Sequence, residues 1–189
     1  TSDQLQLLNA YDRVRQPLQS IRPALRYPEV LSSTLVRLAE EFDLPVADDQ
    51  LIVFSRIAAT HKPFPDSVQS LNDLRSMGLK LAALSNIDEE SFAKVTSAAN
   101  LKFDITVTAE RVGAYKPDHA HFWAALSDLQ ALGIPMHRVL HVAQSIRADI
   151  VVANDIGLTC VWVNRPGHVF GRTGQGAEDA KPDYVVDSL

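Results

Sequence analysis

The feature that most restricts the fold is a regular alternation of short apolar runs with amphipathic helical segments, which begins near residue 63. The apolar runs have the length of strands and occupy residues 79–84, 104–107, 139–142, 159–163 and 184–186. Helical periodicity occupies residues 88–99, 118–132 and 147–156. Strands that alternate with helices form a parallel sheet with both faces covered. We therefore expect an α/β fold with a Rossmann-like parallel sheet over residues 63–189.

The first part of the chain, residues 1–62, shows helical periodicity alone. Proline removes a hydrogen bond from a helix interior, so Pro17 is expected to end the first helix. Asp48 or Asp49 is a good N-cap for a third helix. We expect a helical domain here, separate from the core at 63–189.

The composition and net charge of the chain argue against nucleic acids and membranes as partners. The 189 residues carry a net charge of −5 and no cluster of Lys and Arg, so nucleic-acid binding is not expected. Every apolar run is much shorter than a bilayer-spanning helix, so no membrane partner is expected. The chain starts without a signal-peptide pattern, and its single cysteine, Cys160, cannot form an internal disulfide. These features favour a cytoplasmic location.

Polar residues come after three of the predicted strands. Ser85 and Asn86 come after the run at 79–84, and Lys116 lies in the loop after the next strand. Ser145 follows the strand at 139–142. Ligands of parallel sheets bind beyond the carboxyl ends of the strands. We expect these side chains to contribute to one site.

The chemistry of these residue types suits a small anionic molecule. The Ser85 hydroxyl, the Asn86 amide and free backbone N–H groups could hold phosphate or carboxylate oxygens, although an N-cap and a turn use the same residues. Lys116 is held extended by Pro117 and could neutralise an anion as a compact charge. The alternative for Lys116 is an ordinary solvated loop lysine.

Two further titratable residues accompany the strand at 139–142. Asp149 lies early in the following helix. It could orient Lys116 through an ion pair, or it could lie in the second coordination shell of a metal ion. The alternative for Asp149 is a favourable place near the positive end of a helix dipole. His141 lies inside the strand, where a satisfied core histidine is favoured over a catalytic one.

Taken together, several segments resemble the haloacid dehalogenase superfamily, and in particular its type II 2-haloacid dehalogenase-like branch. The segments that carry the resemblance are residues 64–67, 84–88, 114–117, 141–145 and 149–165. The resemblance extends over essentially the whole chain. It implies a Rossmann-like core at 63–189 and a helical cap at 1–62, inserted after the first core strand.

The resemblance also implies roles for individual residues. Ser85 would match the hydroxyl that binds the substrate anion, and Asn86 and Ser145 would help to bind the same molecule. Lys116 would match the lysine of the third motif, and Asp149 the acidic residue of the fourth. Lys116 and Asp149 are therefore the expected catalytic residues.

The sequence departs from the family pattern in three respects. The nucleophilic aspartate of the family ends the first core strand ahead of the cap, and we expect that strand to be absent from these 189 residues. Gln144 stands where phosphatases of the superfamily place an aspartate, so no cofactor is expected and Mg²⁺ is disfavoured. Ile146 and Phe122 stand where true 2-haloacid dehalogenases carry asparagine and tyrosine.

Two hypotheses about function follow, with a third one less favoured. The first is a hydrolase that acts on a small anionic substrate by carbon–halide or related ester cleavage, with the nucleophile strand supplied from elsewhere. The second is a non-catalytic relative that acts as a binding or assembly protein. A missing central strand would expose sheet edges, which would favour pairing with another chain, as in a homodimer. The third is an enzyme without a covalent intermediate.

Overall fold

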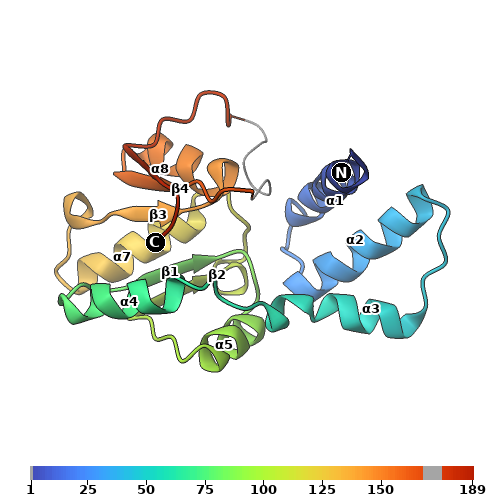
Figure 1. Cartoon of the computed structure of the whole chain (residues 1–189), viewed down its shortest axis with the longest axis horizontal. Helices are drawn as coiled ribbons and strands as arrows, with labels where there is room; N and C mark the ends of the chain where they lie inside the picture. Colours follow the sequence, from blue (N-terminus) through green and yellow to red (C-terminus); the bar gives the residue numbers. More distant parts are fainter. Residues whose placement is uncertain (1, 168–175) are drawn as a thin grey trace. The chain divides into compact units, whose positions relative to one another are not determined.

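The computed structural model describes residues 2–167 and 176–189, and the chain forms two compact units (Figure 1). The first unit consists of Thr1–Lys62, Ser85–Leu101 and Thr108–Tyr115. The second consists of Pro63–Leu84, Lys102–Val107 and Lys116–Leu189. The first unit thus contains the predicted helical segment and two further segments from the α/β part of the chain.

The first unit is helical. Its elements are α1 (Ser2–Gln19), α2 (Tyr27–Glu41), α3 (Asp48–Ser55), the 3₁₀ helix η1 (Ile57–Thr60), α5 (Glu89–Ala98) and α6 (Ala109–Val112). Two clusters of buried side chains lie among its described residues, Leu18, Val30, Ala109 and Tyr115 in one and Ala10, Val14 and Leu38 in the other. The packing of α1 against α2 therefore comes from apolar side chains at helical spacing.

Two local predictions for this unit were wrong. α1 does not end at Pro17 but continues to Gln19. Pro17 removes one hydrogen bond from the last turn of the helix. Burial of the adjacent Leu18, which is 2% exposed, offsets this loss and favours the extra turn. The N-cap of α3 is Ala47 rather than an aspartate. Both aspartates lie in the first turn instead, where the helix dipole still favours their charge.

The strands lie mainly in the second unit and confirm the predicted α/β class. They are β1 (Ala82–Ser85), β2 (Ile105–Thr108), β3 (His141–Ala143), β4 (Cys160–Val163) and β5 (Tyr184–Val186). The helices between them include α4 (Ser67–Ser76), α7 (Ala120–Ala131), η2 (Met136–Arg138), the π-helical turn η3 (Ile146–Ile150) and α8 (Val151–Ile156).

Within the residues that the structure describes, the strands form two sheets rather than the single one that we expected. β1 is hydrogen-bonded to β2, and β3, β4 and β5 form a second sheet in that order. β4 is parallel to both of its neighbours, with His141 opposite Cys160 and Val161 opposite Tyr184. Within the described parts of the chain, β1 and β3 each have a strand on one side only.

One apolar cluster holds the second unit together around α7, η3 and α8. Its buried members are Phe122, Ile150, Val152, Ala153, Leu158 and Cys160. Leu84 of β1 and Trp162 of β4 pack against them. Asp149 directly precedes the buried Ile150, and Ser85 directly follows Leu84, so the cluster helps to position these two predicted site residues.

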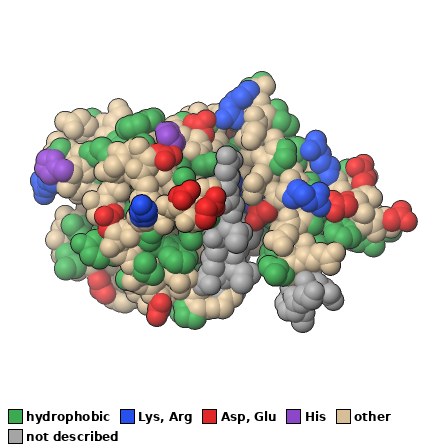
Figure 2. Space-filling view, turned by 90° about the horizontal axis from the view of Figure 1, so that it is seen from above, with side chains coloured by type: hydrophobic (Ala, Val, Ile, Leu, Met, Phe, Trp, Pro, Cys, Tyr) green, Lys and Arg blue, Asp and Glu red, His purple; other side chains and the backbone are tan. Residues whose placement is uncertain are grey.

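The surface shows both signs of charge. On the face seen in Figure 2, acidic and basic side chains are interspersed among apolar ones. None of the helices in the described residues has both the length and the apolar character that a bilayer crossing requires.

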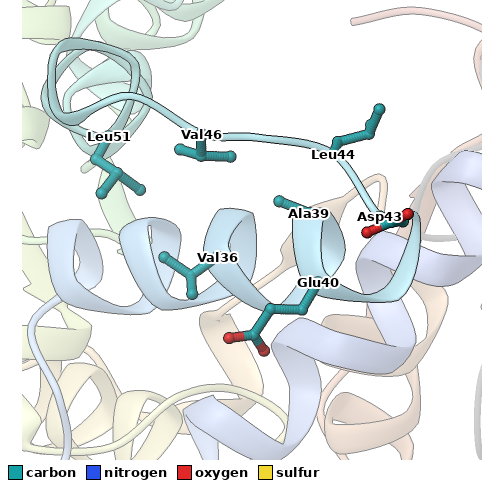
Figure 3. A pocket seen from close by; sticks show the side chains of 7 residues that line it. All are labelled: Val36, Ala39, Glu40, Asp43, Leu44, Val46 and Leu51. Carbon is teal, nitrogen blue, oxygen red and sulfur yellow. The ribbon is translucent and has the colours of Figure 1, made fainter.

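A cavity of about 370 Å³ lies in the first unit, between α2 and α3 (Figure 3). Its lining is mostly apolar, with two carboxylates, and consists of Val36, Ala39, Glu40, Asp43, Leu44, Val46 and Leu51. None of the residues predicted to bind substrate is among them.

Candidate active site

Lys116 is a buried lysine that is held at two points. The residue is 6% exposed. Its ammonium Nζ donates to the Leu84 carbonyl oxygen at 2.8 Å and to Asp149 Oδ1 at 2.7 Å. The loop before it begins at Gly113, which takes a φ of +64° that favours glycine. The alternative of a solvated loop lysine is therefore wrong.

Tyr115, the residue before Lys116, is anchored separately. It is buried in the first unit, and its hydroxyl donates to the Leu25 carbonyl oxygen at 2.7 Å. Its ring lies 6.2 Å from that of Tyr27, measured between centroids. The unit boundary passes between Tyr115 and Lys116.

Asp149 reaches Lys116 from a π-helical turn. We predicted a regular helix over 147–156, but the first turn after β3 is η3, in which Ile150 N–H donates to the Ser145 carbonyl oxygen at 3.3 Å. The Ser145 hydroxyl oxygen caps this turn by accepting from Ala148 N–H at 3.2 Å. π-Helical turns are rare in proteins overall, but those that occur are often found at functional sites. Here the turn holds a buried carboxylate.

His141 is the third member of this cluster, and sequence reasoning assigned it no part in the site. Its Nε2 lies 3.2 Å from Asp149 Oδ1, the oxygen that Lys116 also contacts. Its ring packs against Phe122, with 4.8 Å between ring centroids. The one signal in the sequence was a titratable residue inside an apolar strand, three residues before Gln144. We call Lys116, Asp149 and His141 the Lys–Asp–His cluster.

The cluster keeps Asp149 ionised. Burial by itself raises the pKa of the Asp149 carboxyl, but the charge of Lys116 and the hydrogen bond from His141 outweigh burial and hold the pKa well below its ordinary value. The site therefore contains a fixed, buried pair of opposite charges.

This depressed pKa predicts a loss of stability in acid. The stabilisation by Asp149 is fully present above the ordinary carboxyl pKa of about 4 and is lost as the pH falls toward the lower pKa of the folded state. We expect the gap in unfolding free energy between the wild type and Asp149→Asn to shrink by about 1 kcal/mol from pH 7 to pH 3, because the unfolded chain takes up the proton in this range while the folded chain does not. Urea titrations at several pH values measure it, and a gap that stays constant would contradict the assignment.

The remaining predicted residues lie at strand ends, as follows. Ser85 is the last residue of β1, and Asn86 follows it. Both belong to the first unit, whereas Lys116 and Asp149 belong to the second. Ser145 directly follows Gln144, whose carbonyl oxygen accepts from the indole N–H of Trp162 at 3.1 Å. The structure brings Lys116 and Asp149 into contact, and the part of Ser85, Asn86 and Ser145 in substrate binding stays a prediction.

The fold places the chain in the class of Rossmann-like α/β proteins with a helical cap. Residues 6–157 match the family described as haloacid dehalogenase-like hydrolase, and the chain belongs to that family. The resemblance to its 2-haloacid dehalogenase-like branch is thereby confirmed.

Two curated relatives show how much of the chain is shared. It is 32% identical to the (S)-2-haloacid dehalogenase of Pseudomonas sp. (strain YL) over 185 residues, which cover 97% of this chain and 70% of that protein. It is 33% identical to the (S)-2-haloacid dehalogenase H-109 of Pseudomonas putida over 114 residues, or 59% of this chain and 49% of that protein. The second match thus spans about half of the relative's length.

Solved structures support the same fold. The crystal structure of the L-2-haloacid dehalogenase PA0810 superposes with a TM-score of 0.75 and 22% sequence identity. The superposition covers 97% of this chain and 79% of that one. At this identity the likeness establishes the fold alone.

Proposed function

We propose that this chain provides the charge-stabilising part of a hydrolase that removes halide, or a related leaving group, from small carboxylic acids. One observation carries the proposal: a buried ammonium, Lys116, is held in place by a buried carboxylate and a strand carbonyl. A fixed buried charge suits the recognition of a substrate carboxylate. The names of the curated relatives supply the class of substrate.

The reaction takes two steps. An attacking carboxylate forms a C–O bond to the substrate carbon while the C–X bond breaks and the halide leaves with its electron pair. Water then attacks the resulting ester, which releases a 2-hydroxy acid and restores the carboxylate. We assign the attacking carboxylate to no residue of this chain. In this scheme Lys116 offsets the substrate's negative charge, and Asp149 orients Lys116.

Ser85, Asn86 and Ser145 are proposed to bind the same anion. The proposal for Ser85 and Asn86 rests on their place in the chain, directly after Leu84, whose carbonyl oxygen contacts Lys116. That for Ser145 rests on its place at the start of the turn that carries Asp149. Hydroxyl and amide groups can donate to carboxylate oxygens.

The donor set does not fit a magnesium ion. Mg²⁺ prefers anionic or neutral oxygen ligands that are not already engaged by cations. Asp149 Oδ1 already contacts an ammonium and an imidazole nitrogen, and residue 144 is a neutral glutamine. Within the described residues, no three His, Cys, Asp or Glu side chains gather as a metal site would require. We derive no step through a metal.

The test is binding and reaction of (S)-2-chloropropionate with the 189-residue chain. We expect calorimetry to show binding that Lys116→Gln weakens about 10- to 100-fold, since a charge-assisted hydrogen bond is lost. Lys80→Gln is the matched control, because Lys80 pairs with Asp104 on the surface and its side chain is 56% exposed. Circular dichroism checks that both variants are folded. Equal affinities of the Lys116→Gln variant and the wild type would contradict the proposal.

Intact-mass spectrometry of the same mixtures addresses the covalent step. We expect no ester adduct on these 189 residues, because no attacking carboxylate is assigned among them. A trapped adduct would identify a nucleophile in this chain and correct that part of the scheme.

A non-catalytic binding or assembly protein is the second candidate. It is supported by the one-sided pairing of β1 and β3 in the described residues, since open strand edges are templates for pairing with another chain. Sedimentation of the chain at several concentrations tests this alternative. A monomer at every concentration would count against it.

A further inference from the structure

We propose that His141 is a positioning residue that sets the positive charge which the Lys–Asp–His cluster presents to an anion. The inference rests on the proposed function, because it concerns the same anion site. It assigns a role to a histidine that is not needed to hold the strand itself together.

The geometry places two nitrogen atoms within hydrogen-bonding distance of one oxygen. Lys116 Nζ lies 2.7 Å from Asp149 Oδ1, and His141 Nε2 lies 3.2 Å from the same atom. For His141 to donate, its proton must be on Nε2. Each donor then competes with the other for the lone pairs of a single carboxylate oxygen. Asp149 is therefore shared between His141 and Lys116 instead of pairing with Lys116 alone.

The imidazole is fixed in this position. The His141 backbone N–H donates to the Thr159 carbonyl oxygen at 2.9 Å, and the residue lies opposite Cys160 in the parallel register. The ring packs against Phe122 at 53° between ring planes. The strand and the aromatic neighbour thus hold the ring beside Asp149.

The charges around His141 are few. Asp149 of η3 and, through it, Lys116 face the imidazole, while Phe122 of α7 carries no charge. On the β4 side, the Asp183 carboxylate accepts from the backbone N–H of Cys160 at 2.8 Å. When the imidazole is neutral, the positive charge of Lys116 and the negative charge of Asp149 cancel. A second proton on the ring gives the cluster one net positive charge.

The expected consequence is a pH-dependent affinity for anions. Histidine is the side chain whose charge changes between about pH 5 and pH 8. An added positive charge close to the bound anion strengthens its binding.

The experiment titrates propionate, a carboxylate without a leaving group, into the 189-residue chain by calorimetry at constant ionic strength. For the wild type we expect the affinity to rise about five- to tenfold from about pH 8.5 to pH 6, corresponding to a shift of up to one pKa unit on binding. His141→Gln keeps an N–H donor for Asp149 but cannot gain a charge. Its affinity should stay near the alkaline value of the wild type at every pH.

His119→Gln is the matched control. His119 belongs to the same unit and pairs with Asp155 at 3.4 Å, but both side chains are largely exposed. This variant should keep the pH dependence of the wild type. A flat wild-type profile, or a His141→Gln profile that still rises in acid, would overturn the role of His141 while leaving the anion site standing. Wild-type protein that binds no propionate at any pH would overturn the proposed site and this inference with it.

Discussion

Lys116→Met is expected to lower the free energy of unfolding by about 3–5 kcal/mol, because it leaves a buried carboxylate without its ammonium partner. Both side chains of the pair are only 8% exposed, so water cannot replace the lost charge. Methionine has a similar length and keeps most of the packing. The effect can be measured from the midpoint and slope of urea-induced unfolding.

The matched control for this substitution is Lys94→Met. Lys94 pairs with Glu90 four residues earlier on α5, and both side chains are more than half exposed. Removal of such a pair should leave the unfolding midpoint almost unchanged. Lys116→Met combined with Asp149→Asn should recover part of the lost stability, because the double variant no longer buries an unpaired carboxylate. A loss in Lys116→Met no larger than in Lys94→Met would contradict the buried ion pair.

Phe122→Ala is expected to cost about 3–5 kcal/mol of unfolding free energy. Phe122 is 1% exposed and belongs to the apolar cluster that also contains Ile150 and Val152. Truncation would leave a cavity there and remove the ring that supports His141. Unfolding in urea measures the loss, and propionate binding at low pH should weaken in parallel.

A control for the cavity lies next to it on α7. Trp123 is larger than Phe122 but 52% exposed. Trp123→Ala should therefore cost much less than Phe122→Ala despite the greater volume that is removed. If the two substitutions cost the same, the cluster around Phe122 would not be the core of this unit.

The strands were predictable because each one lies in a short run of apolar residues that is bounded by turn residues. The run at 159–163 lies between Gly157 and Pro166 and contains β4. The pairing of strands was harder, since periodicity within a strand carries no information about its neighbours. The division into two sheets, and the inclusion of 85–101 and 108–115 in the helical unit, depend on contacts between distant residues.

The site was predictable in part for similar reasons. Lys116 and Asp149 could be proposed as an ion pair because each follows a strand. The contact between Asp149 and His141 could not, because it depends on the π-helical turn that begins at Ile146. We predicted a regular helix for that segment, and helical periodicity in the sequence does not reveal a π-helical turn.

The anchoring of Tyr115 has a consequence for the freedom of the loop that carries Lys116. Tyr115 is tied by its hydroxyl to Leu25, and the very next side chain is tied to Leu84 and Asp149. One peptide bond therefore links two fixed anchors that belong to different units. The backbone at this peptide bond is therefore restrained on both of its sides.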